Sequence, residues 1–378
     1  MIPFNLPHLT NEELPFIKEV FDSKKFSGDG AFTKKCQQYF EEKYNFPKVL
    51  LTSSCTDALE MSAILADIGP GDEVIVPSYT FVSTVNAFIL RGAKIVFADS
   101  NELEPNIAVD TVAGLVTPKT KAIVVVHYGG VACDMKQLME LAEEKGFVVI
   151  EDAAQAIDAY YYDRPLGSIG HMSAFSFHDT KNINAGEGGI LVVNDPTRIK
   201  RAEIIWEKGT NRSAFLRGEV DKYTWVDIGS SFLPSEITAA FLYAQLLHLD
   251  EIQAKRKEIW MNYHSCFVKR GLDKLIGLPY YPDYASHNGH IYYMICRSLE
   301  ERTALCAFLS GKGVKAVSHY LSLHKSPFFA GQHDGRVLVN SDRFTDCLVR
   351  LPLYYDLQPE EQQQVIDAIC EFYKIALR

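Results

Sequence analysis

Short hydrophobic runs alternate with longer stretches of helical periodicity along the first two thirds of the chain. The runs are residues 48–51, 73–76, 93–98, 121–127, 146–150, 173–177 and 189–193, and helical stretches include 56–68 and 79–91. Each run is apolar without polar alternation, which is typical of strands buried on both faces of a parallel sheet. Strands that alternate with helices predict an α/β domain, with a mainly parallel sheet and helices on both faces.

The pattern changes near residue 246, where a long helical stretch begins. It covers residues 246–270 and precedes a strand-like run at 288–297, a helix at 300–312, a strand at 315–319 and a closing helix at 359–375. This mixture predicts a smaller α+β domain attached through the long helix. We therefore expect a large domain at residues 1–245 and a small C-terminal domain at residues 246–378.

Composition and charge narrow the possible classes of function. Of the 378 residues, 47% are hydrophobic and 23% are charged, as in an ordinary globular protein. With 48 acidic and 38 basic residues the formal charge is −10, which disfavours nucleic acid or an anionic membrane surface as the main partner. No apolar run approaches the ~20 residues of a membrane helix and no signal peptide is evident, so we expect a cytoplasmic protein.

Metal and nucleotide motifs are missing from the sequence. The eight cysteines include no CxxC pair and are expected to be reduced thiols. His127 and Cys133 are six positions apart and no HxxxH motif occurs, so no metal site is expected. The glycine-rich dinucleotide fingerprint, the P-loop and the GxSxG nucleophile motif are also absent.

Candidate chemistry follows the ends of two predicted strands, where open α/β sheets bind their ligands. Glu151 and Asp152 follow the run 146–150, and an acid at the end of a buried strand needs a partner unless it simply caps a helix. Lys181 lies between the run 173–177 and the glycine cluster at 186–189. A partly desolvated lysine there could form a Schiff base with a carbonyl, although a loop lysine can also be an ordinary surface residue.

Together these features fit the requirements of pyridoxal phosphate. This cofactor needs a lysine for its aldehyde, an acid at its pyridine nitrogen and a cradle of backbone N–H groups for its phosphate. The turn at residues 52–57 offers such a cradle between a strand and a helix, or is a simple capping turn. Phe81 could stack on the cofactor ring or pack in the core.

Four motifs, in this order, make the chain resemble a known family. They are Ser54-x-Thr56-x-Ala58-Leu59, Pro77-x-Tyr79-Thr80-Phe81, Glu151-Asp152-Ala153-Ala154-Gln155, and Ser176-Phe177-His178-x-Thr180-Lys181-Asn182 followed by Gly186-Glu187-Gly188-Gly189. Over nearly its whole length the chain is similar to the DegT/DnrJ/EryC1/StrS sugar aminotransferases. The resemblance implies a fold-type I pyridoxal-phosphate enzyme with a seven-stranded sheet, and a homodimer that shares its active sites between subunits.

The resemblance also implies roles for the cofactor-binding residues. Lys181 would form the Schiff base and move the proton, and Asp152 would hold the pyridine N–H. Phe81 would stack on the ring, and Gln155 would reach its hydroxyl side. The implied phosphate contacts are Thr56, Asp57, Ser176 and, for the partner subunit's cofactor, Ser231. Asp57 and Ser231 depart from the Ala and Asn that members usually carry.

Substrate-binding candidates are fewer and each has a plainer alternative. Lys208 and Arg212 could bind the nucleotide diphosphate, since arginine suits phosphate, or could belong to a solvated loop. By resemblance, His319 and Tyr320 could contact the hexose or be an ordinary strand-end pair. His178 could bind substrate or stabilise the lysine loop.

Within the family, the chain most resembles the dTDP-4-keto-6-deoxyglucose 4-transaminases of enterobacterial common-antigen type. The segments that carry this likeness are 51–56, 126–133, 207–213, 221–225 and 227–231, and the loop 181–189 fits the 4-amination branch. The implied reaction moves an amino group from an amino acid, by analogy L-glutamate, to C4 of dTDP-4-keto-6-deoxy-D-glucose, giving a dTDP-4-amino-4,6-dideoxyhexose for a surface polysaccharide. A sister enzyme acting at C3 or on another nucleotide sugar, and a non-catalytic cofactor-binding regulator, are the alternatives.

Overall fold

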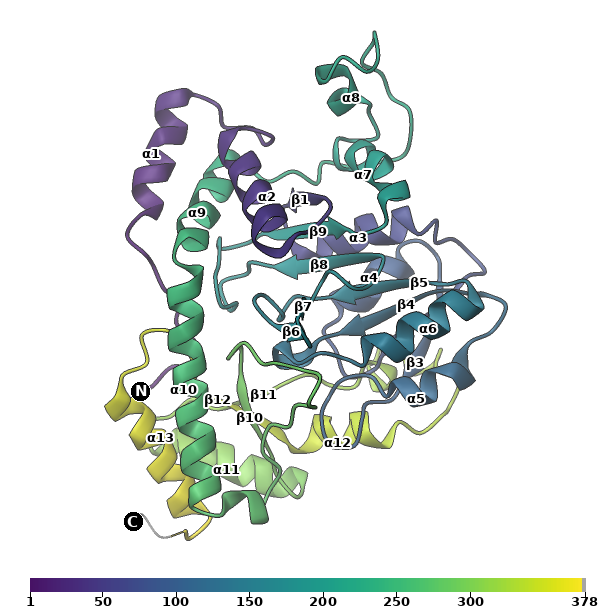
Figure 1. Ribbon diagram of the computed structural model, residues 1–378. Helices are drawn as coiled ribbons and strands as arrows, with labels where there is room; N and C mark the ends of the chain where they lie inside the picture. The colour runs from purple at the N-terminus through teal and green to yellow at the C-terminus, as the bar shows by residue number, and fades with distance from the viewer. Residues whose placement is uncertain (376–378) are drawn as a thin grey trace.

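The computed structural model describes residues 1–375 and is built around a seven-stranded sheet with the order β1-β9-β8-β5-β4-β2-β3 (Figure 1). The strands are β1 (Val49–Thr52), β2 (Glu73–Pro77), β3 (Lys94–Ala98), β4 (Thr120–Val126), β5 (Val148–Asp152), β8 (Met172–Ser176) and β9 (Gly189–Val193). The pairs between β3 and β8 are parallel, whereas β9 runs antiparallel to both of its neighbours. The predicted α/β fold with a mainly parallel sheet is confirmed.

Alternate residues of the strands are buried on opposite faces of this sheet. Leu51 and Ile123 belong to one core, and Leu50 and Val124 belong to the other. The first core is covered by α2 (Ala31–Tyr44), α6 (Met135–Lys145) and α9 (Glu236–Leu247). The second is covered by α3 (Cys55–Leu65), α4 (Ser83–Ile89) and α7 (Ile199–Trp206). Because both faces are covered, the strands are apolar throughout.

A second, three-stranded sheet with the order β10-β12-β11 lies toward the C-terminal end of the chain (Figure 1). It is reached through α10 (Leu249–Lys269), and its elements are β10 (Tyr292–Ile295), α11 (Leu299–Gly311), β11 (Val317–Ser318), α12 (Val339–Cys347), β12 (Leu348–Leu351) and α13 (Pro359–Phe372). Ile2 bridges to Val314 and packs in the same core, so the first residues lie with the C-terminal elements. The division at residue 246 stays a prediction.

Two helices differ from their predicted bounds. The stretch 246–270 is divided at His248, whose backbone (φ −107°, ψ 9°) leaves the helical region between α9 and α10. The stretch 79–91 shortens to α4, because the residues just after β2 turn to line a cavity before the helix begins. Elements that the sequence did not predict include α1 (Glu13–Ser23), α5 (Val109–Val112), α8 (Arg212–Leu216), the hairpin β6 (Tyr160–Tyr161) and β7 (Arg164–Pro165), and also α2, α6, α12 and β12.

Three further observations concern the side chains and helices of the described residues. All eight cysteines are free thiols. Between residues 1 and 375, no helix is both long and apolar enough to cross a membrane. No group of three or more His, Cys, Asp or Glu side chains in that range is arranged to hold a metal ion.

Candidate active site

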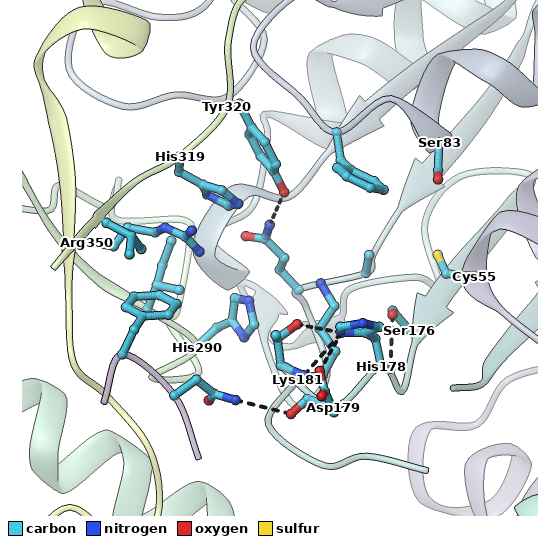
Figure 2. Close-up of a pocket in the computed structure, with 18 of the residues that line it drawn as sticks. Cys55, Ser83, Ser176, His178, Asp179, Lys181, His290, His319, Tyr320 and Arg350 are labelled. Carbon is cyan, nitrogen blue, oxygen red and sulfur yellow. Dashed lines mark hydrogen bonds and ion pairs between the residues drawn. The ribbon is translucent and has the colours of Figure 1, made fainter. Parts of the chain in front are cut away.

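A cavity of about 890 Å³ lies at the carboxyl ends of the parallel strands, where the two sheets meet (Figure 2). Residues of the large-sheet strands and their loops form one wall, and residues from the small sheet form the other. The structure places these predicted site residues in its lining: Thr56, Phe81, Asp152, Gln155, Ser176, His178, Lys181, His319 and Tyr320. The N-terminal segment contributes Phe4 and Asn5 to the same cavity.

Asp152, the last residue of β5, is a buried carboxylate held by hydrogen bonds. Its Oδ2 accepts from Thr84 Oγ1 at 2.7 Å, and its Oδ1 accepts from the Ala154 N–H at 3.1 Å. Burial raises the pKa of the Asp152 carboxyl, and these hydrogen bonds oppose that shift. Asp152 forms no ion pair with any residue from 1 to 375. A ligand that presents a positively charged N–H is therefore the partner that would keep this carboxylate ionised.

Lys181 lies in the loop between β8 and β9, with its amine in the cavity (Figure 2). Its backbone N–H donates to the His178 carbonyl at 2.9 Å, and the next residue, Asn182, donates to Gln253 Oε1 at 2.7 Å. Burial lowers the pKa of the Lys181 amine, and the nearby charge of Arg350 lowers it further. Within the described part of the chain, the amine makes no hydrogen bond or ion pair. It is thus available to react with a carbonyl.

The first turn of α3 forms one end of the cavity, and Figure 2 shows Cys55, Ser83 and Ser176 together on that side. Thr56 Oγ1 donates to Ser83 Oγ at 2.8 Å. The Cys55 and Thr56 backbone N–H groups, at the start of the helix, have no acceptor among residues 1–375. Free N–H groups at a helix start, together with hydroxyl side chains, suit a phosphate.

Close packing of β9 against this turn shapes the phosphate end. A Cβ added to Gly189 would lie 2.5 Å from the Cys55 backbone nitrogen and 2.5 Å from the Ser54 carbonyl carbon. A side chain at this position would therefore push the helix start away from the sheet. The glycine of the Gly186-Glu187-Gly188-Gly189 motif is explained by this approach of two backbones.

The wall opposite α3 is built around His319 and Tyr320. The Tyr128 hydroxyl and His319 Nδ1 form a hydrogen bond of 2.9 Å, and Gln155 Nε2 donates to the Tyr320 hydroxyl at 3.0 Å (Figure 2). Gln155 Oε1 in turn accepts from the Gly129 N–H at 2.6 Å. Burial lowers the pKa of His319 well below its usual value, so its imidazole is neutral at neutral pH. Hydrogen bonds thus join the small sheet to the loops of the large one.

His178 is oriented by its own loop. Its Nδ1 lies 2.9 Å from Thr180 Oγ1 and 3.0 Å from Asp179 Oδ1, and its Nε2 lies 3.7 Å from Glu187 Oε1. The imidazole lines the cavity and is partly exposed. It therefore stabilises the lysine loop while still facing the space where a substrate would bind.

Two of the predicted phosphate contacts lie outside the cavity lining. The backbone N–H of Asp57 already donates to Ser54 Oγ at 3.1 Å, so it caps α3, and burial raises the pKa of its carboxyl. Ser231 is exposed and pairs with Glu207 in an isolated bridge. The free N–H groups nearest the cavity are those of Cys55 and Thr56.

The two predicted diphosphate-binding cations also lie outside this chain's cavity. Arg212 Nη1 is 3.0 Å from Asp29 Oδ2 and also contacts Glu207. Lys208 lies 3.8 Å from Glu207 Oε2 and its side chain is 54% exposed. In the single chain, both cations are thus paired with acids rather than directed at Lys181.

Arg350 and His290 line the cavity although motif reading did not find them. Arg350 lies on β12, a four-residue strand with a charge in its middle. His290 precedes β10, and its Nδ1 is 2.7 Å from Asn182 Oδ1, next to Lys181. The run at 288–297 was predicted as a strand, but nothing local in the sequence connects it to the lysine loop.

The residues present fit pyridoxal phosphate. A buried acid without a cation, a lysine amine without a partner and a helix start with free N–H groups lie around one cavity. These are the groups that the ring nitrogen, the aldehyde and the phosphate of this cofactor require. Fold and site together define a pyridoxal-phosphate-dependent transferase.

Comparison with known proteins identifies the family. Residues 7–370 match the DegT/DnrJ/EryC1/StrS aminotransferase family, and the chain belongs to it. The spore coat polysaccharide biosynthesis protein SpsC of Bacillus subtilis (strain 168) is 30% identical over 387 aligned residues, covering 99% of this chain and 97% of SpsC. GDP-perosamine synthase of Escherichia coli O157:H7 is 30% identical over 373 aligned residues, covering 98% of each chain.

Solved structures extend the likeness to the whole fold. The aminotransferase TlmJ from Streptoalloteichus hindustanus superimposes with a TM-score of 0.90 at 30% identity, over 99% of each chain. Spr1654 from Streptococcus pneumoniae, described as a sugar aminotransferase, has a TM-score of 0.89 in its PLP form at 25% identity, over 99% of this chain and 98% of that one. The fold-type I architecture, the cofactor and the class of enzyme are confirmed: the protein is a pyridoxal-phosphate-dependent sugar aminotransferase.

Proposed function

We propose that this enzyme transfers the amino group of L-glutamate to C4 of a nucleotide-linked 4-keto-6-deoxyhexose, namely dTDP-4-keto-6-deoxy-D-glucose. The product would be a dTDP-4-amino-4,6-dideoxyhexose, made in the cytoplasm for a bacterial surface polysaccharide. The observation that carries the C4 assignment is the loop after the lysine, Ile183-Asn184-Ala185-Gly186-Glu187, which resembles the 4-amination branch of the family.

The residues around the cavity have distinct tasks in this proposal. Pyridoxal phosphate supplies the electron sink and carries the amino group between the two substrates. The Lys181 amine, whose pKa is lowered, takes and returns the proton at the reacting carbon. Asp152 holds the pyridine N–H, and Thr56 and Ser176 hold the phosphate at the start of α3.

A neutral hexose needs a wall of hydrogen-bonding and aromatic groups rather than charges. Tyr320, His319 and His178 provide hydroxyl and imidazole groups along the lining, and the pKa of His319 is low enough to keep it neutral. Phe81, with 55% of its surface exposed, presents a ring to the same space. We assign the ring of Phe81 to the cofactor and the three polar side chains to the sugar.

We propose further that two copies share their active sites. Apolar side chains stand exposed on the segment that follows α8, with Tyr223 at 53%, Trp225 at 79% and Ile228 at 45%. Figure 1 shows α8 and this segment projecting from the body of the molecule. Large exposed apolar patches mark interaction sites. In a dimer built there, Ser231, Lys208 and Arg212 would serve the partner's cavity; elution as a fully active monomer in gel filtration would contradict this.

The test of the reaction is direct product identification. The purified enzyme is mixed with L-glutamate and dTDP-4-keto-6-deoxy-D-glucose, and the amino sugar is assigned by NMR. We expect an amine at C4 and one 2-oxoglutarate for each amino sugar formed. An amine at C3 would place the enzyme in the sister branch. A GDP-linked keto-sugar is the matched alternative substrate, because one relative is named GDP-perosamine synthase, and a clear preference for it would overturn the dTDP assignment.

A further inference from the structure

Three buried amide side chains form a cluster beside the lysine loop. They belong to Asn182, which follows Lys181, to Gln253 on α10, and to Asn288 just before β10. Asn182 Nδ2 donates to Gln253 Oε1 at 2.7 Å and to the Asn288 carbonyl at 3.0 Å. The amide cluster thus joins the lysine loop to α10 and to the start of the small sheet.

The amide cluster also determines which ring nitrogen of His290 carries a proton. A backbone carbonyl can only accept, so the Asn182 atom next to the Asn288 carbonyl must be the amide nitrogen. The other atom, Asn182 Oδ1, can only accept, and it lies 2.7 Å from His290 Nδ1. Nδ1 is therefore the nitrogen that bears the proton. The His290 backbone N–H donates to Asn288 Oδ1 at 3.0 Å, which fixes the residue from a second side.

The second ring nitrogen of His290, Nε2, has no hydrogen-bond partner among residues 1–375. Burial lowers the pKa of His290 well below its usual value, so the imidazole is neutral and Nε2 carries a lone pair. The residue is only 7% exposed and lines the cavity. A poorly hydrated acceptor of this kind needs an N–H or O–H group from within the cavity.

Lys181 carries the charge that acts most strongly on this imidazole. Of the charges that lower the pKa of His290, that of Lys181 is the largest, ahead of Arg256 and Arg350. For His319, the other histidine of the small-sheet wall, Arg350 comes first. Figure 2 shows His290 between Arg350 and Lys181. Of these two imidazoles, His290 is therefore the one placed to meet the lysine amine.

The chemistry of the Lys181 amine calls for a neutral acceptor. Whenever this amine is released from the cofactor, it must move a proton, and its lone pair must then point at the reacting carbon. Its N–H bonds have to be held on the other side. A carboxylate would hold the amine as an ammonium ion, whereas a neutral imidazole accepts an N–H and stabilises the ammonium form more weakly.

We propose that His290 is a further catalytic residue, whose Nε2 accepts an N–H hydrogen bond from the free Lys181 amine and so orients the amine lone pair toward the reacting carbon. Asn182 is the positioning residue that keeps Nε2 unprotonated. The amine reaches Nε2 by rotation of its flexible four-carbon stem. The inference rests on the proposed function in one respect, that Lys181 moves the proton.

Two substitutions separate the two nitrogens of His290. His290→Asn places an amide N–H near the position of Nδ1 and keeps the contact with Asn182, but none of its atoms reaches the position of Nε2. His290→Gln has the converse effect, because its longer side chain places an amide group near the position of Nε2. His264→Asn, on α10 and outside the cavity lining, is the matched control.

The first measurement follows the Lys181 amine itself. Adding pyridoxamine phosphate to the cofactor-free enzyme gives the form in which this amine is free, and neither substrate is needed. The rate at which acetic anhydride acylates Lys181 is then measured against pH by mass spectrometry. Nε2 favours the ammonium form through a charge-assisted hydrogen bond, so His290→Asn should move the labelling midpoint to lower pH. His290→Gln and His264→Asn should keep the wild-type midpoint.

The second measurement follows each half-reaction of the holoenzyme from the change in cofactor absorbance. In the first half-reaction the amino donor gives its amino group to the cofactor, and in the second the amino group passes to the sugar ketone. Both need proton transfer by Lys181. We therefore expect His290→Asn to slow each by about 10- to 100-fold, the range for one hydrogen bond to a charged group. His290→Gln should be slowed less, and His264→Asn should match wild type.

Several outcomes would overturn the inference. They are an unmoved labelling midpoint in His290→Asn, a larger loss in His290→Gln than in His290→Asn, and a loss confined to the sugar step, which would assign Nε2 to a sugar hydroxyl. If His290→Asn does not fold, a changed midpoint in His290→Gln would refute the inference and an unchanged one would support it. A wild type that does not aminate the keto-sugar would contradict the proposed function alone, because the labelling still decides the role of His290.

Discussion

The two walls of the active-site cavity are built in different ways. On the large-sheet wall, Asp152 is the last residue of a strand, and Thr56 and Lys181 lie in short motifs that follow strands. On the small-sheet wall, His290, His319 and Arg350 come from three separate segments that meet only through the sheet order β10-β12-β11. The first wall is specified by local chain geometry, whereas the second depends on strand register across the small sheet.

The walls also differ in which polar groups are left without a partner. Asp152 accepts two hydrogen bonds, and the first turn of α3 is capped by Ser54. Arg350, in contrast, makes one long hydrogen bond and has a buried Nε without a partner. The groups left free on the large-sheet wall, the N–H groups of Cys55 and Thr56 and the Lys181 amine, are those that the phosphate and the aldehyde of the cofactor require. A wall with an unused cation suits ligands that exchange in every cycle.

The largest effect is expected from Lys181→Ala on the cofactor wall. Losing the group that moves the proton should slow turnover by at least about 10²–10⁴-fold. It should slow both half-reactions, because both need the same proton transfer. Steady-state and half-reaction rates check this, with the exposed Lys145→Ala of α6 as the control. Turnover that survives in Lys181→Ala would contradict the assignment of proton transfer to the large-sheet wall.

Asp152→Asn should have the next largest effect. Thr84 and the Ala154 N–H can still hydrogen-bond an amide oxygen, so the fold should persist, but the negative charge at the pyridine nitrogen is lost. We expect turnover to fall by about 10²-fold or more, the scale for removing one electrostatic stabiliser of a transition state. Both half-reactions should slow alike, because both use the same protonated ring. Unchanged rates would remove Asp152 from the chemistry.

A stability effect should come from Gly189→Ala. The new Cβ would lie 2.5 Å from backbone atoms of Ser54 and Cys55, which cannot move independently of α3. We expect a loss of about 1–3 kcal/mol in the free energy of unfolding, together with weaker cofactor binding. Gly188→Ala is the matched control, because its nearest neighbours would be Ala185 and Phe177 side-chain atoms at 3.5 Å. Equal stability of the two variants would contradict the close approach of β9 and α3.

The smallest effect is expected on the pH dependence of stability in the protein without cofactor. Burial raises the pKa of Asp152 in the folded state above its ordinary value of 3.8. The stability that this shift contributes is therefore fully present at pH values below 3.8. It is lost as the pH rises through the raised pKa of the folded state. Asp152→Asn should be the more stable protein at neutral pH, with the difference vanishing in acid. Thermal melts across pH check this; a wild type that gains stability relative to the variant as pH rises would contradict it.

Much of the cofactor wall was predictable, and particular residues show why. Asp152 ends β5 and Lys181 lies in the loop after β8, so hydrophobic runs alone place them at one edge of the sheet. His319 and Tyr320 were found through resemblance rather than through local pattern. Arg350 was missed because β12 is four residues long, contains the charge itself and is followed by Pro352. Its position opposite Tyr293 is a matter of long-range pairing.

Neither the sequence nor the structure of a single chain is sufficient to assign a role to Lys208, Arg212 and Ser231. Sequence motifs attach them to the site, yet in one chain they lie outside the cavity and Arg212 is held by Asp29 and Glu207. The proposed dimer accounts for that separation. The exposed Trp225 on the neighbouring segment is the residue whose burial would mark the interface.

The sequence by itself determined the class of fold, the cofactor-binding motifs and the acidic overall charge. Strand periodicity, turn residues and the spacing of an acid and a lysine are local properties, and local chain geometry is sufficient to express them. Only the tertiary structure decided which residues of the small sheet face Lys181, and that a guanidinium there has no acid to neutralise it. That outcome depends on the pairing of segments far apart in the chain, which no single stretch of sequence encodes.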